Sequence, residues 1–149
     1  MRKAKLTEEN RKTFLLALHK LIDSATEKSA QNVVANKVQD LAIYPPNGGF
    51  STSEIETLKQ IASIPRTESV LRKIIADANG QVIFNLLNFF DGTGDPDTDL
   101  GKWTGVALAD SNQIEENNAG MLHDDFSESY WDWMKIRPKK DWKLDSLDS

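Results

Sequence analysis

The densest apolar pattern in the chain lies in residues 70–90, where large apolar residues recur with the period of an α-helix. One stripe of this pattern has steps of three and four residues, which places its members on one side of a helix. They are Leu71, Ile75, Ala78, Val82, Leu86 and Phe89. Residues 82–90 are apolar on more than one side, as in a helix surrounded by other elements. The pattern therefore predicts that this stretch is the core helix of the fold.

The ends of this helix also have sequence signals. Thr67 or Ser69 is predicted to open it, and Asp91-Gly92 to end it, because glycine is the usual residue at the left-handed position after a helix. Asn79-Gly80 lies inside the stretch and costs about 1 kcal/mol of helix propensity relative to alanine. Since the apolar phase continues across it, we expect a kink or a very short break there.

The N-terminal part of the chain carries a second helical pattern. Thr7 is expected to cap a helix whose apolar stripe consists of Phe14, Leu18, Leu21, Ile22 and Ala25. Polar residues at 24–32 interrupt this stripe, which is then resumed by Val33, Val34, Val38, Leu41 and Ala42. We predict a break or kink near residues 26–29, with one long helix as the alternative. Two prolines and two glycines in residues 44–49 then end the pattern.

Two shorter helices are predicted further along the chain. Ser51 with Glu54, and Ser53 with Glu56, both have the spacing of a capping box, so a helix should begin near Ser51 and end by Pro65. Residues 123–135 read as the last helix, with Phe126, Tyr130, Trp133 and Met134 at helical spacing. Arg137-Pro138 should end it. Residues 139–149 are predicted to be a tail with Trp142 as its candidate anchor.

Residues 92–120 are rich in Gly, Asp, Asn and Thr and show no helical period. Their only regular candidate is a short strand at residues 103–109, which needs a partner that the sequence does not identify; an extended loop is the alternative. The predicted fold is therefore mainly α: a compact single-domain helical bundle of about five helices, with an irregular acidic segment and at most a short strand pair. Residues 1–149 are read as one domain, with flexible ends at 1–5 and 143–149.

The composition limits the kinds of protein and of functional site that this chain can form. A chain of 149 residues with 39% hydrophobic and 28% charged residues is typical of a soluble globular protein. It contains no apolar run long enough to span a membrane and no apolar segment of a secretory signal, so we expect a cytoplasmic protein. The absence of cysteine excludes disulfides and thiolate chemistry, and two histidines are too few for a histidine-rich metal site.

Charge is distributed unevenly along the chain. Residues 91–132 hold eleven acidic residues and one basic residue, Lys102, a net charge of −10. Residues 1–90 carry twelve basic and nine acidic residues, and residues 133–149 carry five basic and three acidic residues. The mildly acidic chain, with a net charge of −5, is therefore an acidic segment within a slightly basic remainder. Such a segment would repel phosphates, which argues against nucleic acid as its ligand.

The acidic segment contains a candidate metal-binding loop. Asp95, Asp97 and Asp99 alternate as the first ligands of an EF-hand loop do. An EF-hand loop requires glycine at position six and glutamate at position twelve, but this chain has Leu100 and Val106 there, so the full template does not fit. A different calcium or magnesium loop that uses Asp91, Asp95, Asp97 and Asp99 stays an alternative. An ordinary acidic turn, with aspartates capping backbone amides, is the favoured interpretation.

Signals for catalysis are weak. His123, Asp124 and Asp125 with Glu128 superficially resemble the paired His-Asp of metal phosphohydrolases, but those sites need further histidines and the chain offers only His19. The sequence shows no nucleophile elbow and no phosphate-cradling glycine loop. The sequence therefore favours a protein that is not an enzyme and needs no cofactor, with an unrecognised enzyme as an alternative.

The last helix carries the candidate partner-binding residues, which are Asp124, Asp125, Glu128, Trp131 and Asp132. Trp131 and Trp133 are two residues apart and so point to nearly opposite sides of a helix. An exposed Trp131 among carboxylates would be a binding anchor, although the favoured interpretation packs all four tryptophans inside. We expect an interaction protein that uses this helix and the acidic segment against a basic protein partner. In general character it is similar to small acidic helical proteins that neutralise basic nuclease toxins.

Overall fold

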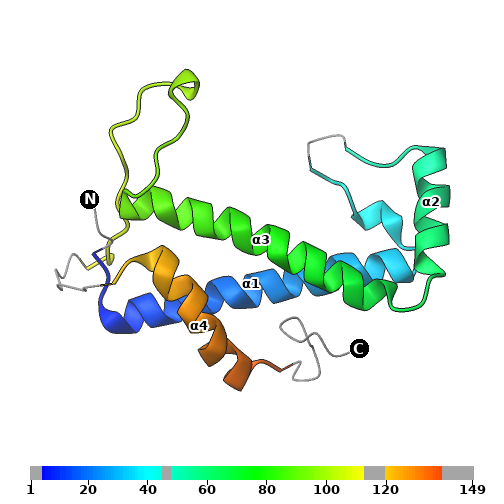
Figure 1. Ribbon diagram of the computed structural model, residues 1–149, viewed down its shortest axis with the longest axis horizontal. Coiled ribbons are helices and arrows are strands. Elements are labelled where there is room, and N and C mark those ends of the chain that lie inside the picture. The colour runs from blue at the N-terminus through cyan, green and yellow to red at the C-terminus, as the bar shows by residue number, and fades with distance from the viewer. Residues whose placement is uncertain (1–4, 45–47, 113–119, 139–149) are drawn as a thin grey trace. The chain divides into compact units, whose positions relative to one another are not determined.

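The computed structural model describes residues 5–44, 48–112 and 120–138 and shows a mainly helical protein, as predicted (Figure 1). The described residues form four α-helices: α1 (Glu8–Val34), α2 (Thr52–Ala62), α3 (Thr67–Asp91) and α4 (Leu122–Ile136). Two short 3-10 helices, η1 (Val38–Asp40) and η2 (Thr98–Leu100), complete the regular structure of this part of the chain. None of these helices combines the length and the apolar character that crossing a membrane requires. The predicted anchor Trp142 lies outside the described residues.

The chain divides into two compact units, which are described separately. The first unit takes the described residues within Met1–Leu21 and Gly80–Trp142, and the second takes those within Ile22–Asn79. In the first unit, α4 lies alongside the first turns of α1, because Arg11 contacts Asp125 and His19 contacts Phe126 (Figure 1). Its buried apolar side chains are Leu6, Leu15, Leu87, Leu122, Phe126 and Trp133.

The second unit shows why the predicted break in the first helix is wrong. Helix α1 continues through residues 26–29 to Val34, so the alternative of one long helix is correct there. Ile22, Thr26, Ala30 and Val33 are buried and recur at helical spacing. Because Thr26 and Ala30 are small, they fit the covered side of the helix although the sequence around them is polar. The predicted extension through Leu41 is replaced by the short helix η1.

The start of α2 agrees with its sequence signal. Ser51 is the N-cap, its hydroxyl accepts a hydrogen bond from the Glu54 backbone N–H, and the Glu54 carboxylate accepts one from the Ser51 backbone N–H. This reciprocal pair is the predicted capping box. Helix α3 begins at Thr67, whose hydroxyl donates to the carbonyl oxygens of Ile61 and Ile64, and so closes the turn between α2 and α3.

Helix α3 is less covered than its apolar pattern predicts. It runs without a break through Asn79-Gly80, and Leu87 is its one fully buried apolar side chain. Ala78, Val82 and Leu86 of the predicted core stripe are exposed, Val82 to 69%. The expectation of a helix surrounded by other elements is therefore wrong. Because residues 82–90 are apolar on several sides, the pattern could not distinguish the covered side from the exposed ones.

The described residues after α3, 92–112, belong to the first unit, and residues 108–110 pair with Lys5 at its start. Gly92 takes a left-handed conformation with φ +70°, so α3 ends where predicted. The predicted strand at residues 103–109 is absent; instead, Ala109 pairs with Lys5 in an isolated parallel bridge. The Lys5 N–H donates to the Leu108 carbonyl oxygen at 2.7 Å, and the Asp110 N–H donates to the Lys5 carbonyl oxygen at 3.0 Å. Lys5, expected in a flexible end, is thus held by this bridge.

Candidate functional site

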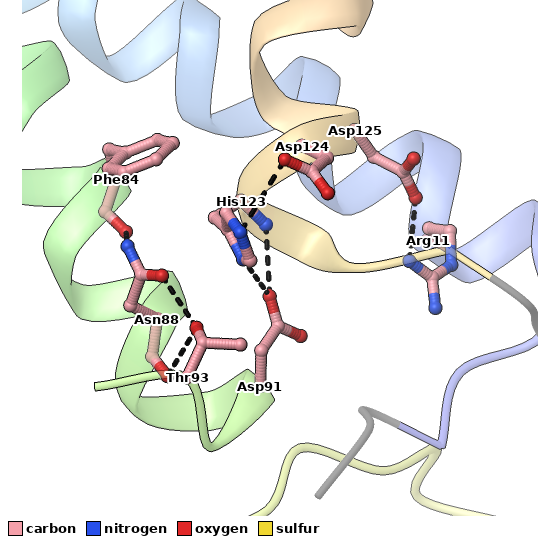
Figure 2. Close-up of polar contacts among 8 residues, drawn as sticks. All are labelled: Arg11, Phe84, Asn88, Asp91, Thr93, His123, Asp124 and Asp125. Carbon is pink, nitrogen blue, oxygen red and sulfur yellow. Dashed lines mark hydrogen bonds and ion pairs between the residues drawn. The ribbon is translucent and has the colours of Figure 1, made fainter. Parts of the chain in front are cut away.

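The start of α4 is fixed by a buried carboxylate at the end of α3. Asp91 is fully buried, and its Oδ2 accepts hydrogen bonds from the backbone N–H of His123 at 3.0 Å and from the ring Nδ1 of His123 at 2.7 Å (Figure 2). With its ring proton on Nδ1, His123 donates to this carboxylate oxygen from its ring as well as from its backbone. The ring of Phe84 meets the His123 ring edge-on, with centroids 5.3 Å apart. Asp91 therefore acts as an acceptor for one of the free amides at the start of α4, that of His123.

A second contact holds the first turn of α4 against α1. The Arg11 guanidinium donates to Asp125 Oδ2 at 2.7 Å, and Arg11 is buried (Figure 2). Gly120 lies next to this carboxylate: a β-carbon at residue 120 would be 2.8 Å from Asp125 Oδ2. Asp125, predicted to bind a partner, is therefore engaged within the fold.

The covered side of α4 packs on a buried histidine of α1. The Nε2 of His19 lies 2.8 Å from the Phe126 carbonyl oxygen and 2.9 Å from the Ser129 hydroxyl oxygen. The His19 ring stacks on the Phe126 ring, with centroids 4.5 Å apart and planes 6° from parallel. Because a buried histidine needs partners for its polar atoms, these contacts give His19 a packing role.

The opposite side of α4 is open and carries most of the predicted binding residues. Asp124, Glu128, Trp131 and Lys135 recur at steps of three and four residues and are exposed, which places them on one stripe; we call this stripe, together with the adjacent Asp132, the outward face of α4. Trp131 is 56% exposed, so the favoured interpretation with all tryptophans inside is wrong. The buried tryptophan of this helix is Trp133. The helical period predicts only that the two tryptophans lie on opposite sides of α4, and the structure shows that Trp133 is on the covered side.

The carboxylates of the outward face differ in what they contact. Asp132 accepts a hydrogen bond from Lys135 at 3.0 Å, and this bond with the lysine's charge holds the pKa of Asp132 below its usual range. The Asp124 carboxylate is 72% exposed, and among the described residues its one ion-pair contact is with the His123 Nε2, at 3.5 Å (Figure 2). Within the described residues, the Glu128 carboxylate forms no hydrogen bond or ion pair. Asp124 and Glu128 are therefore the most available charges of this face.

The aspartates of the candidate metal loop are not gathered around a common point. Asp91 is turned toward His123, and Asp95 accepts a hydrogen bond from the Trp103 indole N–H at 3.0 Å. Asp97 precedes η2 without capping it through its side chain, and Asp99 lies exposed in that helix. Across the residues that the structure describes, no three His, Asp or Glu side chains come together in a way that could hold a metal ion.

The start of α1 also depends on a carboxylate that the sequence did not single out. Asp110 is buried, and its Oδ2 accepts a hydrogen bond from the Thr7 backbone N–H at 3.2 Å. Hydrogen bonding from the Asn10 side chain, and also from Thr7, holds the pKa of Asp110 below its usual range although burial opposes this. An open depression beside it is lined by Thr7, Glu8, Glu9, Asn10, Lys12, Asp110 and Asn112. Because the Oδ2 of its buried carboxylate accepts a hydrogen bond from the Thr7 backbone N–H, we assign Asp110 to the support of α1.

Sequence reasoning missed Arg11, His19 and Asp110 as parts of this region. Their partners are separated from them by more than a hundred positions, 114 for Arg11 and Asp125 and 103 for Asp110 and Thr7. No local pattern encodes such pairings. Comparison of the chain with protein-family models, with curated proteins and with solved structures gives no match. Any function of this protein must therefore be inferred from the geometry of the first unit.

Proposed function

We propose that this protein is a non-enzymatic interaction protein that binds a basic protein partner through the outward face of α4. The acidic segment that contains this face, residues 91–132, would add a negative potential around it. An inhibitor- or immunity-type role, in which the protein covers a basic surface of its partner, is the form of interaction that we propose. Such surfaces are matched by charge, which speeds association and disfavours wrong partners.

The observation that carries this proposal is the composition of the outward face. An exposed tryptophan lies among carboxylates that the rest of the described chain leaves largely unused, namely Asp124 and Glu128. Tryptophan is among the residues that contribute most to binding energy at protein interfaces. Carboxylates around such an anchor attract basic groups and repel phosphates. A protein with Lys or Arg side chains around an apolar contact is therefore the complementary partner.

The structure also changes how this proposal should be tested. Replacing Asp125 would break its ion pair with Arg11 and disturb α4, so a loss of binding could follow from misfolding. A double variant, Asp124→Asn with Glu128→Gln, removes two negative charges. Among the described residues, the one contact that it affects is the 3.5 Å ion pair between Asp124 and His123. A matched control is Asp40→Asn with Glu56→Gln, which removes two exposed charges from the second unit.

We expect the unaltered protein to capture a basic protein from a lysate at low salt and to release it at high salt. The dissociation constant, measured with the captured protein, should rise roughly two- to thirty-fold in the α4 double variant, since each exposed ion pair contributes about 0.2–1 kcal/mol. The control should bind as the unaltered protein does. Capture that is equal in all three proteins, or that does not respond to salt, would contradict the proposal.

A further inference from the structure

We propose that Trp131 and Glu128 form a recognition site for an arginine side chain of the partner. This inference depends on the function proposed above and specifies its chemistry. Glu128 lies three residues before Trp131, so the two side chains are neighbours on the outward face of α4. An exposed indole beside a carboxylate presents two surfaces to one ligand group: a ring face that attracts cations and an anion that pairs with them.

Arginine fits this pair of surfaces better than lysine does. Its guanidinium is planar and weakly hydrated, so it can stack on an indole while its N–H groups donate to a carboxylate. The ammonium of lysine is a compact, strongly hydrated charge that gains less from an aromatic face. The Trp131–Glu128 pair should therefore prefer arginine, whereas the negative charge of the outward face alone would attract both residue types.

The cation in the last turn of α4 and the one at its C-cap are engaged away from this pair. Lys135 is one turn after Trp131, the position from which its side chain could reach the indole, but its ammonium binds Asp132 at 3.0 Å. Arg137 is buried, and its guanidinium lies over the Tyr130 ring at 5.5 Å. Within the described residues, the ring contact of Trp131 is with Tyr130 and not with a cation. The indole and the Glu128 carboxylate are thus available together.

A ring contact with Tyr130 also limits the rotamers that the Trp131 side chain can adopt. The Tyr130 ring meets the Trp131 ring edge-on, with centroids 5.4 Å apart and planes at 71°. Tyr130 is itself fixed by the Arg137 guanidinium and by the edge of His19, whose ring centroid is 5.8 Å away. A side chain that is oriented before binding loses less conformational entropy in the complex. These contacts prepare the indole as a stacking surface.

The test compares two peptide probes of equal length and charge, oligoarginine and oligolysine, both with blocked ends. Binding is followed at low salt through the NMR signal of the Trp131 indole N–H and by calorimetry. We expect oligoarginine to bind roughly two- to five-fold more tightly than oligolysine, which is the effect of one exposed cation–π contact. Trp131→Leu and Glu128→Gln should each remove this preference, and Trp131→Phe should retain part of it. The control Tyr44→Leu, which alters an exposed aromatic residue of the second unit, should leave the preference unchanged.

The possible outcomes separate this inference from the proposed function. Equal binding of the two probes, with both weakened by Glu128→Gln, would overturn the arginine site and leave the acidic interaction surface in place. A preference for arginine that survives Trp131→Leu would also overturn the site, because arginine would then be recognised elsewhere. If neither probe binds at low salt, the proposed function fails together with the inference. Circular dichroism of each variant checks that α4 remains folded.

Discussion

At the scale of single residues, the buried carboxylate of Asp91 determines how α4 begins. It is the acceptor for the His123 backbone N–H, one of the amides that an α-helix cannot satisfy internally. The same oxygen binds the His123 ring, while the other oxygen, Oδ1, has no hydrogen-bond partner among the described residues. Asp91 was a candidate metal ligand in the sequence, but its contacts in the structure are those of a helix cap supplied by another helix.

We expect Asp91→Ala to lower the free energy of unfolding by about 1–3 kcal/mol, because a partly buried N–H and a histidine ring lose their acceptor. Asp97→Ala is the matched control, since Asp97 is exposed and forms no capping bond through its side chain; it should change the stability by less than about 0.5 kcal/mol. Urea unfolding followed by circular dichroism measures both. Equal stability of the two variants would show that the Asp91–His123 contact does not support α4.

At the scale of elements, replacing two glycines by alanine should change the stability in opposite directions, through α3 for Gly80 and through α4 for Gly120. A β-carbon at Gly80, in the middle of α3, would meet no atom within 4 Å. Gly80→Ala should therefore raise the free energy of unfolding by about 1 kcal/mol through helix propensity alone. A β-carbon at Gly120 would lie 2.8 Å from the Asp125 carboxylate that Arg11 holds. Gly120→Ala should displace that carboxylate and lower the free energy of unfolding by about 1 kcal/mol or more.

The unfolding free energies of both variants can be measured by urea titration, with Asp125→Ala as a second background for Gly120→Ala. If the clash with the carboxylate is the cause, Gly120→Ala should cost little once the carboxylate is gone. An equal cost in both backgrounds would place the effect in the backbone instead. Destabilisation by Gly80→Ala would mean that the centre of α3 is more tightly packed than the structure shows.

The same elements show how far the sequence predicts this structure. The capping box of α2 and the end of α3 at Gly92 were predictable, because each depends on residues within three or four positions of one another. On α4, the period of the helix predicted that Trp131 and Trp133 lie on opposite sides, but it left open whether Trp131 is covered. The period could not show that Asp125 pairs with Arg11, because that pairing joins separate helices. It also could not identify the covered side of α3, where apolar residues occur all around.

At the scale of the whole molecule, the acidic segment is tied back to the start of the chain. The Lys5–Ala109 bridge and the Asp110–Thr7 hydrogen bond join residues more than a hundred positions apart. Long-range contacts of this kind close a large loop of chain, which has an entropic cost that the contacts must offset. Asp110 is the member of this junction whose carboxylate accepts a hydrogen bond and whose pKa is lowered. The stability of the first unit should therefore depend on the protonation of Asp110.

Hydrogen bonds from Asn10 and Thr7 lower the pKa of Asp110. This lowered pKa determines how the stability changes with pH. A carboxyl group whose pKa is lower in the folded state stabilises the fold above its unfolded pKa, about 3.9, and loses that contribution as the pH falls through the lower, folded value. Asp110→Asn resembles the protonated acid at every pH. The variant should be less stable than the unaltered protein near neutral pH, and the difference should shrink below about pH 5.

Urea unfolding of both proteins at several pH values between about 7 and 3 would measure this difference. Asp99→Asn is the control, because Asp99 is exposed and makes no hydrogen bond through its side chain within the described residues. Its stability should remain close to that of the unaltered protein throughout. A difference for Asp110→Asn that stays constant with pH would mean that the variant disturbs packing rather than charge. A difference that vanishes in acid would show that the ionised Asp110 carboxylate holds the start of α1 to the end of the acidic loop.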